Sequence, residues 1–523
     1  MELIRNSCRA MFWLGAAVLA SVPAFSQAMN ADAAARFLDQ ATWGPTPTAI
    51  DQLQQVGIDA WLDWQFSLSV SDLPDQEIFT EAGTVITNIV PVQSAFVQNA
   101  IYSDDQLRQR VAFVLSQIWV VSHDTVTPAY AFPPYWRIFR DNAFGNYREV
   151  IRALTLNPAM GRYLNMANNV KANPARGTAA NENYARELLQ LFTLGLVELN
   201  LDGTPRLDAN KNAIATYDQS VVTNLSAALT GWTYPTAPDA TPRAANPAYY
   251  IGDMIPVAAN HDTVAKKIFG GITIPARQTA QQDLDSVLDA LMAQPTMAPF
   301  VSKQLIEHLV TSNPSPDYVA RVAGVFRDNG AGVTGDLQAV VRAILTDPEA
   351  RAGDDSSAAL NPTFGHLREP ILFLTSMLRG LSASVGDGNT IYSRSAQLSQ
   401  DLFQAPSVFS YFSPQFRTEK GLLGPEFQIY STQSAALRAN TVNTAIYGTL
   451  DRFTSVDFSY FVAAGSTLDN LVRTIGAVFC HGRMSPDLFL AARTAAAANK
   501  AVLDQVKAAL YVVLTSGEYQ VIH

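Results

Sequence analysis

The chain is poor in cysteine and lacks the short motifs of several enzyme classes. Its two cysteines are Cys8 and Cys480, so a disulfide framework cannot hold the fold. The sequence contains no H-E-x-x-H, C-x-x-C, G-x-S-x-G or glycine-rich phosphate loop. These absences disfavour zincin proteases, haem attachment through paired cysteines, nucleotide hydrolases and standard α/β-hydrolases. A repeat of fixed period is also missing, which disfavours a solenoid.

The chain also lacks an excess of positive charge. It has 36 basic and 46 acidic residues, for a formal net charge of −10. Nucleic-acid binding depends on clustered Lys and Arg, so this composition argues against a nucleic-acid partner. Beyond the N-terminal region, no apolar run is long enough for a transmembrane helix.

Residues 1–28 have the pattern of a secretory signal peptide. Arg5 and Arg9 are followed by an apolar run over 11–20 and by the small-x-small site Ser26-Gln27-Ala28. We therefore expect a periplasmic or secreted protein whose mature chain is 29–523, with cleavage four residues earlier as the alternative. Such a chain keeps only Cys480, which we expect to be buried, and must be stabilised by its core.

Helix signals dominate residues 29–523. They predict a mainly α fold: a large single helical domain with long loops and at most a small β hairpin. Asn30 and Asp218 are placed to cap helices, and Ser103 with Gln106 predicts a capping box for a helix over 104–121. Further helices are predicted over 281–293, 298–311, 317–328, 335–345, 367–381, 426–447, 467–479 and 486–514, and the hairpin over 198–217.

Four stretches interrupt this helical pattern. Residues 165–180, 234–260 and 380–400 are long irregular segments, and both a functional rim and a flexible insertion explain them. Residues 403–416 are rich in aromatic residues and proline. They either line a groove or, as we slightly favour, form a loop that plugs the core.

The densest polar pattern lies in residues 181–195, which predict a helix. One face is apolar, while a second stripe carries polar side chains, and Glu182 is spaced to pair with Arg186. A carboxylate flanked by amides and a guanidinium suits sugar binding or general-base catalysis. The alternative, which we favour, is a buried structural network. The polar stripe consists of Asn183, Arg186, Glu187 and Gln190.

A second polar pair, His261-Asp262, follows the long segment 234–260. A histidine beside an aspartate is suited to act as a general base or as a pair of metal ligands. Equally, Asp262 could cap a helix over 263–269 while His261 binds a carbonyl group.

Motifs along almost the whole mature chain resemble one family. In order, they are RFLDQATWGPT (36–46), RQRVAF (108–113), NENYARELLQLFTLG (181–195), LTGW (229–232), His261-Asp262, REP (368–370), QAPSVF (404–409) and HGRMS (481–485). The chain is similar to the bacterial domain-of-unknown-function family numbered 1800. The resemblance implies an exported, largely helical protein, often encoded beside a sulfatase-like exported family. Gln294 and Ser226 depart from the family pattern, which argues against an obligatory metal ligand at position 294.

Two functions are compatible with these patterns. The first is an exported hydrolase of a cell-surface or extracellular polymer, with polysaccharide favoured. The second is a non-enzymatic exported partner of a sulfatase-like neighbour. The residues assigned to catalysis are Glu187, Asp262 and His261, and those assigned to substrate binding are Asn183, Arg186, Gln190 and Trp232. The sequence identifies no metal site and no cofactor.

Overall fold

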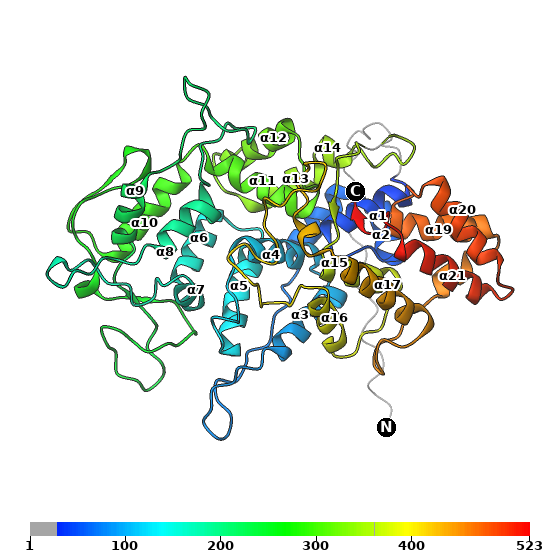
Figure 1. Ribbon diagram of the computed structural model, residues 1–523, viewed down its shortest axis with the longest axis horizontal. Coiled ribbons are helices and arrows are strands. Elements are labelled where there is room, and N and C mark those ends of the chain that lie inside the picture. Colours follow the sequence, from blue (N-terminus) through cyan, green and yellow to red (C-terminus); the bar gives the residue numbers. More distant parts are fainter. Residues whose placement is uncertain (1–28, 360) are drawn as a thin grey trace, which may run out of the picture.

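The computed structural model describes residues 29–359 and 361–523 (Figure 1). The predicted signal peptide, residues 1–28, lies outside the described residues. The described part is mainly α-helical, as predicted, with helices α1 to α21 and three two-stranded sheets. One continuous hydrophobic cluster joins most of the buried apolar side chains from both halves of the chain. The helices therefore form a single domain around a shared core.

The helices fall into three stretches of sequence. The first runs through α1 (Ala31–Ala41), α2 (Pro47–Ser67), α3 (Val90–Tyr102), α4 (Gln106–Ile118), α5 (Phe132–Asn142), α6 (Tyr147–Leu156), α7 (Pro158–Tyr163), α8 (Asn183–Glu187) and α9 (Gln219–Ala228). The second has α10 (Ala280–Met292), α11 (Met297–Leu309), α12 (Pro316–Arg327), α13 (Leu337–Thr346) and α14 (Pro348–Arg351). The third has α15 (Pro370–Gly380), α16 (Asn389–Gln397), α17 (Thr432–Tyr447), α18 (Ser459–Ala463), α19 (Leu468–Cys480), α20 (Pro486–Ala497) and α21 (Val502–Thr515).

The strands are short antiparallel pairs. They are β1 (Trp232–Thr233) with β2 (Ile255–Pro256), β3 (Lys266–Lys267) with β4 (Thr273–Ile274), and β5 (His366–Leu367) with β6 (Val521–Ile522). In the predicted hairpin region, 198–217, the chain forms isolated bridges, such as Leu199 with Pro205 and Leu207 with Ala213. Pairing there is too short to count as a strand.

Two of the three predicted N-caps are confirmed. The side chains of Asn30 and Asp218 accept backbone N–H groups at the start of α1 and α9. The predicted capping box at α4 is wrong, because the helix begins at Gln106, whose side-chain amide donates instead to the carbonyl of Ser103 at 2.8 Å. All of α4 except Ser116 is buried, so its polar side chains lie inside the protein.

Three predicted helices are interrupted or absent. The segment 426–447 breaks because Ser431 and Ser434 form a capping box that starts α17. The segment 486–514 divides into α20 and α21, which pack against each other and so bury apolar side chains of both. No helix follows Asp262, because the chain there enters β3 and pairs with β4.

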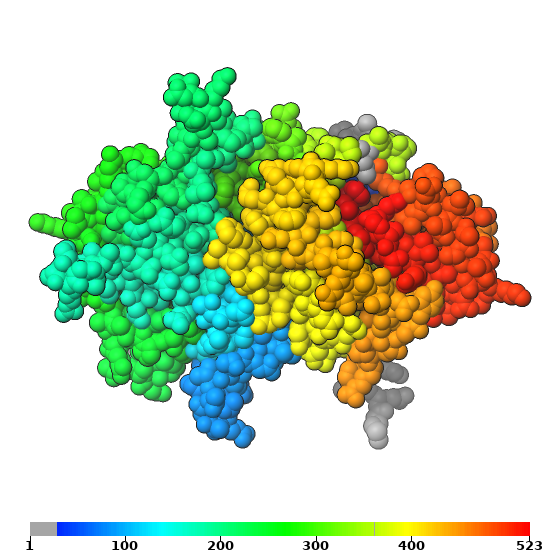
Figure 2. Space-filling model, in the orientation of Figure 1, coloured from blue at the N-terminus to red at the C-terminus, as the bar shows by residue number. Residues whose placement is uncertain are grey.

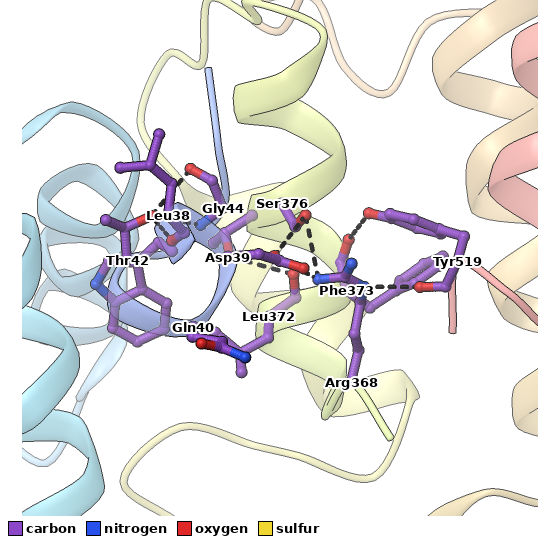
Figure 3. Close-up of polar contacts among 12 residues, drawn as sticks. Leu38, Asp39, Gln40, Thr42, Gly44, Arg368, Leu372, Phe373, Ser376 and Tyr519 are labelled. Carbon is purple, nitrogen blue, oxygen red and sulfur yellow. Dashed lines mark hydrogen bonds and ion pairs between the residues drawn. The ribbon is translucent and has the colours of Figure 1, made fainter. Parts of the chain in front are cut away.

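A buried ionic network joins the beginning, middle and end of the described chain (Figure 3). Asp39 of α1 accepts a 2.6 Å hydrogen bond from Arg368, and the ring of His481 lies 3.0 Å from its other carboxylate oxygen. Arg368 in turn donates to the carbonyl of Tyr519 at 2.7 Å. Burial alone would raise the pKa of Asp39, but Arg368 and His481 hold it below its ordinary value.

Two further predictions concern Cys480 and membrane-spanning helices. Cys480 is buried, as predicted, and burial raises the pKa of its thiol to about 12, which makes it unreactive. None of the helices in 29–359 and 361–523 combines the length and the apolar character that a membrane span requires.

Candidate functional site

The predicted polar helix forms, but its second half is not α-helical. After α8 the chain continues as a π-helical turn over Leu188–Thr193. The N–H of Leu194 donates to the carbonyl of Leu189, five residues earlier, at 2.9 Å. A π turn departs from the 3.6-residue period, so the stripe expected from a straight helix does not extend from Glu187 to Gln190.

Glu187 has no ion pair and no hydrogen bond among the described residues. One of its carboxylate oxygens, Oε2, is buried without a partner, and burial raises the pKa of the group despite the opposing charge of Arg186. Arg186 instead binds Glu182 at 3.1 Å, which confirms the predicted pair. Burial raises the pKa of Tyr163 and Tyr217, and the charge of Glu187 adds to both rises, so the carboxyl group lies near two phenols.

We predict that Glu187→Gln melts at or slightly above the parent temperature at pH 7. The pKa of Glu187 is higher in the folded state than in the unfolded chain, so its ionisation costs stability as pH rises above the ordinary value of 4.5. Melting curves between pH 4 and pH 7 should show the two proteins diverging toward neutrality.

Glu182→Gln is the matched control for this measurement. Burial opposes the shift, but hydrogen bonds from Thr223 and Gln219, with Arg186, lower the pKa of Glu182, so its removal should cost stability at pH 7. A lower melting temperature for Glu187→Gln than for Glu182→Gln would assign Glu187 to a structural network.

The other predicted binding residues differ in exposure. Asn183 and Gln190 are partly buried, and the side-chain amide of Asn183 donates to Asn165 at 3.2 Å. Trp232 lies in β1 within the hydrophobic core and is only 1% exposed. Its indole therefore has no free face on which a substrate could stack.

His261 and Asp262 belong to a separate network that is mostly buried. The ring of His261 lies 2.9 Å from the carbonyl of Thr230 and 3.3 Å from Asp283. Lys266 lies 2.9 Å from Asp283 and 3.7 Å from Asp262. No hydrogen bond or ion pair between described residues links this network to Glu187.

The Thr230–Gly231 loop packs against His261 and helps to keep its ring out of contact with solvent. A Cβ at Gly231 would lie 2.7 Å from the Cβ of His261, and Gly231 has a φ of +87°. Only glycine therefore allows the Thr230–Gly231 turn to lie directly against the backbone and Cβ of His261. The arrangement matches an ion-paired support for this loop better than an open catalytic pair.

A second group of polar side chains lies in the middle of the molecule, and it was not predicted as a site from the sequence. It gathers where α4, α11, β5 and the start of α15 meet the segment 400–430. This segment lies across one face of the molecule, between the N-terminal and C-terminal halves (yellow to orange in Figure 2). We call this group the central polar cluster; its members are Arg110, Gln117, Glu307, His366, Glu369, Gln400 and Glu426.

Both carboxylate oxygens of Glu369 accept hydrogen bonds from other members of the cluster. Its two oxygens accept hydrogen bonds from the amide of Gln117 at 2.9 and 3.1 Å and a further bond from Gln400. Arg110 lies 4.0 Å from Glu369 and donates to the carbonyl of His308 at 3.0 Å. Burial raises the pKa of Glu369, and the nearby Arg110 opposes the rise.

The carboxyl group of Glu307 has a raised pKa, close to neutral pH. Burial raises its pKa to about 7, the charge of Glu426 adds to the rise, and Lys303, 3.8 Å away, opposes it. Its side chain is nevertheless 16% exposed. Burial, with the charges of Arg110 and His366, lowers the pKa of the adjacent His308 to about 3, so that its imidazole is neutral at physiological pH.

Several polar atoms of the cluster have no hydrogen-bond partner in the described part of the chain. The Nδ1 of His366 lies 3.3 Å from Glu426, while its Nε2 and the second oxygen of Glu426 remain unpaired. The amide oxygen of Gln117 is also unpaired, while the Oε1 of Glu307 accepts no hydrogen bond and lies 3.8 Å from the ammonium group of Lys303. Each buried unpaired group costs about 1–3 kcal/mol, so their concentration marks a place where water or a ligand completes the bonds.

The aromatic segment, residues 403–416, covers one side of the central polar cluster. A cavity of about 30 Å³, about the volume that one water molecule occupies in the liquid, is lined by Gln117 and by aromatic side chains that include Trp136, Phe403 and Tyr411. Tyr411 is only 8% exposed, and its hydroxyl accepts the N–H of Phe403 at 3.1 Å. This part of the segment packs into the core, whereas Phe409 remains 41% exposed.

One sequence signal could have revealed the cluster. Gln304, Glu307 and His308 are spaced i, i+3 and i+4, so they form a polar stripe on the largely apolar α11. Their partners come from distant segments and cannot be read from local periodicity. Within the described ranges, no group of three or more His, Cys, Asp or Glu side chains could hold a metal ion.

The fold and the cluster together define a mainly α-helical, single-domain protein with buried carboxyl groups at its centre. The chain belongs to the family described as "Protein of unknown function (DUF1800)", whose model matches residues 36–521. This match confirms the resemblance drawn from the motifs. No curated protein and no solved structure matches the chain.

Proposed function

We propose that the protein is an exported hydrolase that cleaves an extracellular or cell-surface polysaccharide with carboxyl groups of the central polar cluster. The observation that carries the proposal is the concentration of buried carboxyl groups and unpaired polar atoms in this cluster, and burial, which raises the pKa of Glu307 to about 7, suits that group to donate a proton at neutral pH. A second carboxyl group, that of Glu426, is close enough to shift this pKa. Most glycoside hydrolases use two carboxyl groups whose environments give them different pKa values.

Glu307 and Glu426 have different roles in the proposed reaction. Glu307 donates its proton to the glycosidic oxygen as the bond to the anomeric carbon breaks, so that the leaving group departs as a neutral alcohol and not as a strongly basic alkoxide. Glu426 acts at the anomeric carbon, either directly or by activating a water molecule. His366, hydrogen-bonded to one oxygen of Glu426, holds that carboxyl group in place.

The cluster also suits recognition of sugar hydroxyls. A hydroxyl both donates and accepts, and the unpaired atoms of Gln117, His366 and Arg110 include acceptors and donors. Glu307 and His308 retain partial exposure, so we propose that substrate approaches from the α11 side. The exposed ring of Phe409 offers a flat surface on which a sugar could stack.

The residues selected from the sequence receive different roles in this proposal. Glu187, unpaired and half-buried, remains a proposed substrate contact together with Asn183, Arg186 and Gln190. We propose that His261 and Asp262 support the Thr230–Gly231 loop rather than act on substrate.

The mature protein, residues 29–523, should release reducing ends from at least one polysaccharide in a screen of neutral and acidic polymers. Glu426→Gln should lower the rate at least about 100-fold, because an amide cannot act as nucleophile or base. Glu419→Gln, at an exposed position on the same segment, should leave the rate unchanged. Equal rates for the parent and Glu426→Gln would refute the assignment.

The non-enzymatic alternative also has one supporting observation. The ring of His261 is only 1% exposed and lies against the fully buried Asp283, so the histidine of the His261-Asp262 pair is not open to substrate, although Asp262 keeps 19% exposure. On this alternative the protein holds the sulfatase-like exported neighbour or its substrate. Binding of that neighbour without any polysaccharide cleavage, and with equal affinity for Glu426→Gln, would favour the partner role.

A further inference from the structure

A second pocket lies away from the central polar cluster, in the C-terminal helical region. It has a volume of about 380 Å³ and is bounded by the loop 448–456, the end of α17 and the side of α21. The pocket shares no lining residue with the cavity beside Gln117. It is large enough for a monosaccharide-sized ligand.

Two cationic side chains line this pocket without acidic partners. Among the ion pairs between described residues, neither Arg452 nor Lys507 takes part. Arg452 lies 4.4 Å from the ring centre of Phe453, and the ammonium group of Lys507 lies 5.5 Å from that of Phe458. Aromatic faces hold both cations in position and leave their charges unneutralised.

The one acidic side chain in the lining forms no ion pair with either cation. Asp451 accepts the N–H of Phe453 at 2.7 Å and the hydroxyl of Thr454 at 2.8 Å. Burial opposes the shift, but hydrogen bonds from Thr390, Thr454 and the backbone lower the pKa of Asp451. Its oxygens are therefore used to shape the loop and are not paired with Arg452 or Lys507.

The pocket combines positive charge with a ring surface and hydroxyl groups. Phe458 contributes an apolar face, and Thr449 and Ser455 lie in the wall. On a chain with net charge −10, two unpaired cations at one pocket select for an anion. A sugar ring with a carboxylate uses all three features, because the carboxylate meets the cations and the ring packs on Phe458.

We propose that the pocket around Arg452 and Lys507 binds a carboxylated sugar, such as a uronic acid unit of an acidic polysaccharide. The site lies outside the catalytic cluster and does not depend on the hydrolase proposal. If both hold, the pocket anchors an acidic polymer while another part of it is cleaved.

Titration calorimetry of the mature protein with glucuronate, glucose and acetate tests this site. We expect glucuronate to bind with a dissociation constant in the millimolar range, weakening with added salt because the contact is electrostatic. Glucose, which lacks the carboxylate, and acetate, which lacks the ring, should each bind at least tenfold more weakly. Equal binding of glucose and glucuronate would overturn the charge argument, and equal binding of acetate would overturn the sugar argument.

Matched variants locate the binding. Arg452→Gln and Lys507→Gln should each weaken glucuronate binding at least tenfold. Arg473→Gln should not, although Arg473 also lies over an aromatic ring, 5.2 Å from that of Phe489. Glu426→Gln should bind glucuronate like the parent, which separates this site from the catalytic proposal. Unchanged binding in Arg452→Gln and Lys507→Gln would overturn the site.

Discussion

Replacing Asp39 with asparagine should lower the free energy of unfolding by about 3–5 kcal/mol at pH 7, because the change leaves Arg368 charged and buried without its partner. Both side chains are only 1% exposed, so water cannot replace the lost interaction. The contact joins α1 to the start of α15, and through Tyr519 it reaches the strand β6 region. Chemical denaturation of the parent and variant would measure the loss.

The pH dependence of this loss has a defined sign. The folded-state pKa of Asp39 lies below its unfolded value of 3.8, so the stabilisation is present above pH 4 and disappears as the pH falls through the folded pKa. The difference between parent and Asp39→Asn should therefore be full at pH 7 and shrink in strong acid.

Two variants make the result specific. Asp63→Asn removes an exposed partner of Arg342 and should change stability by no more than about 1 kcal/mol. The double variant Asp39→Leu with Arg368→Met should recover much of the stability lost in Asp39→Asn, because it removes both buried charges. If Asp39→Asn unfolds like Asp63→Asn, the buried network does not hold the three segments together.

Local sequence rules predicted the parts of the fold that local interactions determine. Asn30 and Asp218 cap helices because a short polar side chain satisfies the first free N–H groups, and that signal needs no tertiary contact. The helices α10, α11, α12 and α19 lie within a residue or two of the predicted ranges. The apolar periodicity of these helices was strong and uninterrupted.

Tertiary packing determined what the sequence rules missed. The π turn after Glu187 replaces a regular α-helix, and no residue in the helix signals it. The helices α2, α3, α5, α6, α7 and α16 were not anticipated, and α5 even begins with Phe132-Pro133-Pro134. In most of them a buried polar side chain, such as Gln65 of α2 or Gln93 of α3, interrupts the apolar face.

The candidate site depends even more on distant contacts. From the sequence, Glu307 is only one residue of the helix predicted over 298–311, and Glu369 is only part of the family motif REP. Their significance appears when α4, α11 and the segment 400–430 meet and leave polar atoms of Gln117 and Glu426 without partners. Conversely, His261-Asp262 looked reactive in the sequence but is enclosed by Lys266 and Asp283.

Replacing Glu307 with glutamine should lower kcat for polysaccharide cleavage by about 100-fold to 10,000-fold, because the amide has the same shape but no acidic proton. The loss should not come from unfolding. The folded pKa of Glu307, about 7, exceeds its ordinary value of 4.5, so ionisation of the parent costs stability as pH rises between these values. At pH 7 and above, Glu307→Gln should therefore be at least as stable as the parent.

The pH dependence of the activity distinguishes a proton donor from a residue with only a structural role. If Glu307 is the proton donor, the activity of the parent should decline above about pH 7 as the group ionises. Lys303 opposes the raised pKa, so Lys303→Gln should move this decline to higher pH while leaving the maximal rate similar. A decline at the same pH in both proteins, or full activity in Glu307→Gln, would remove Glu307 from the reaction and return the choice of catalytic acid to Glu187.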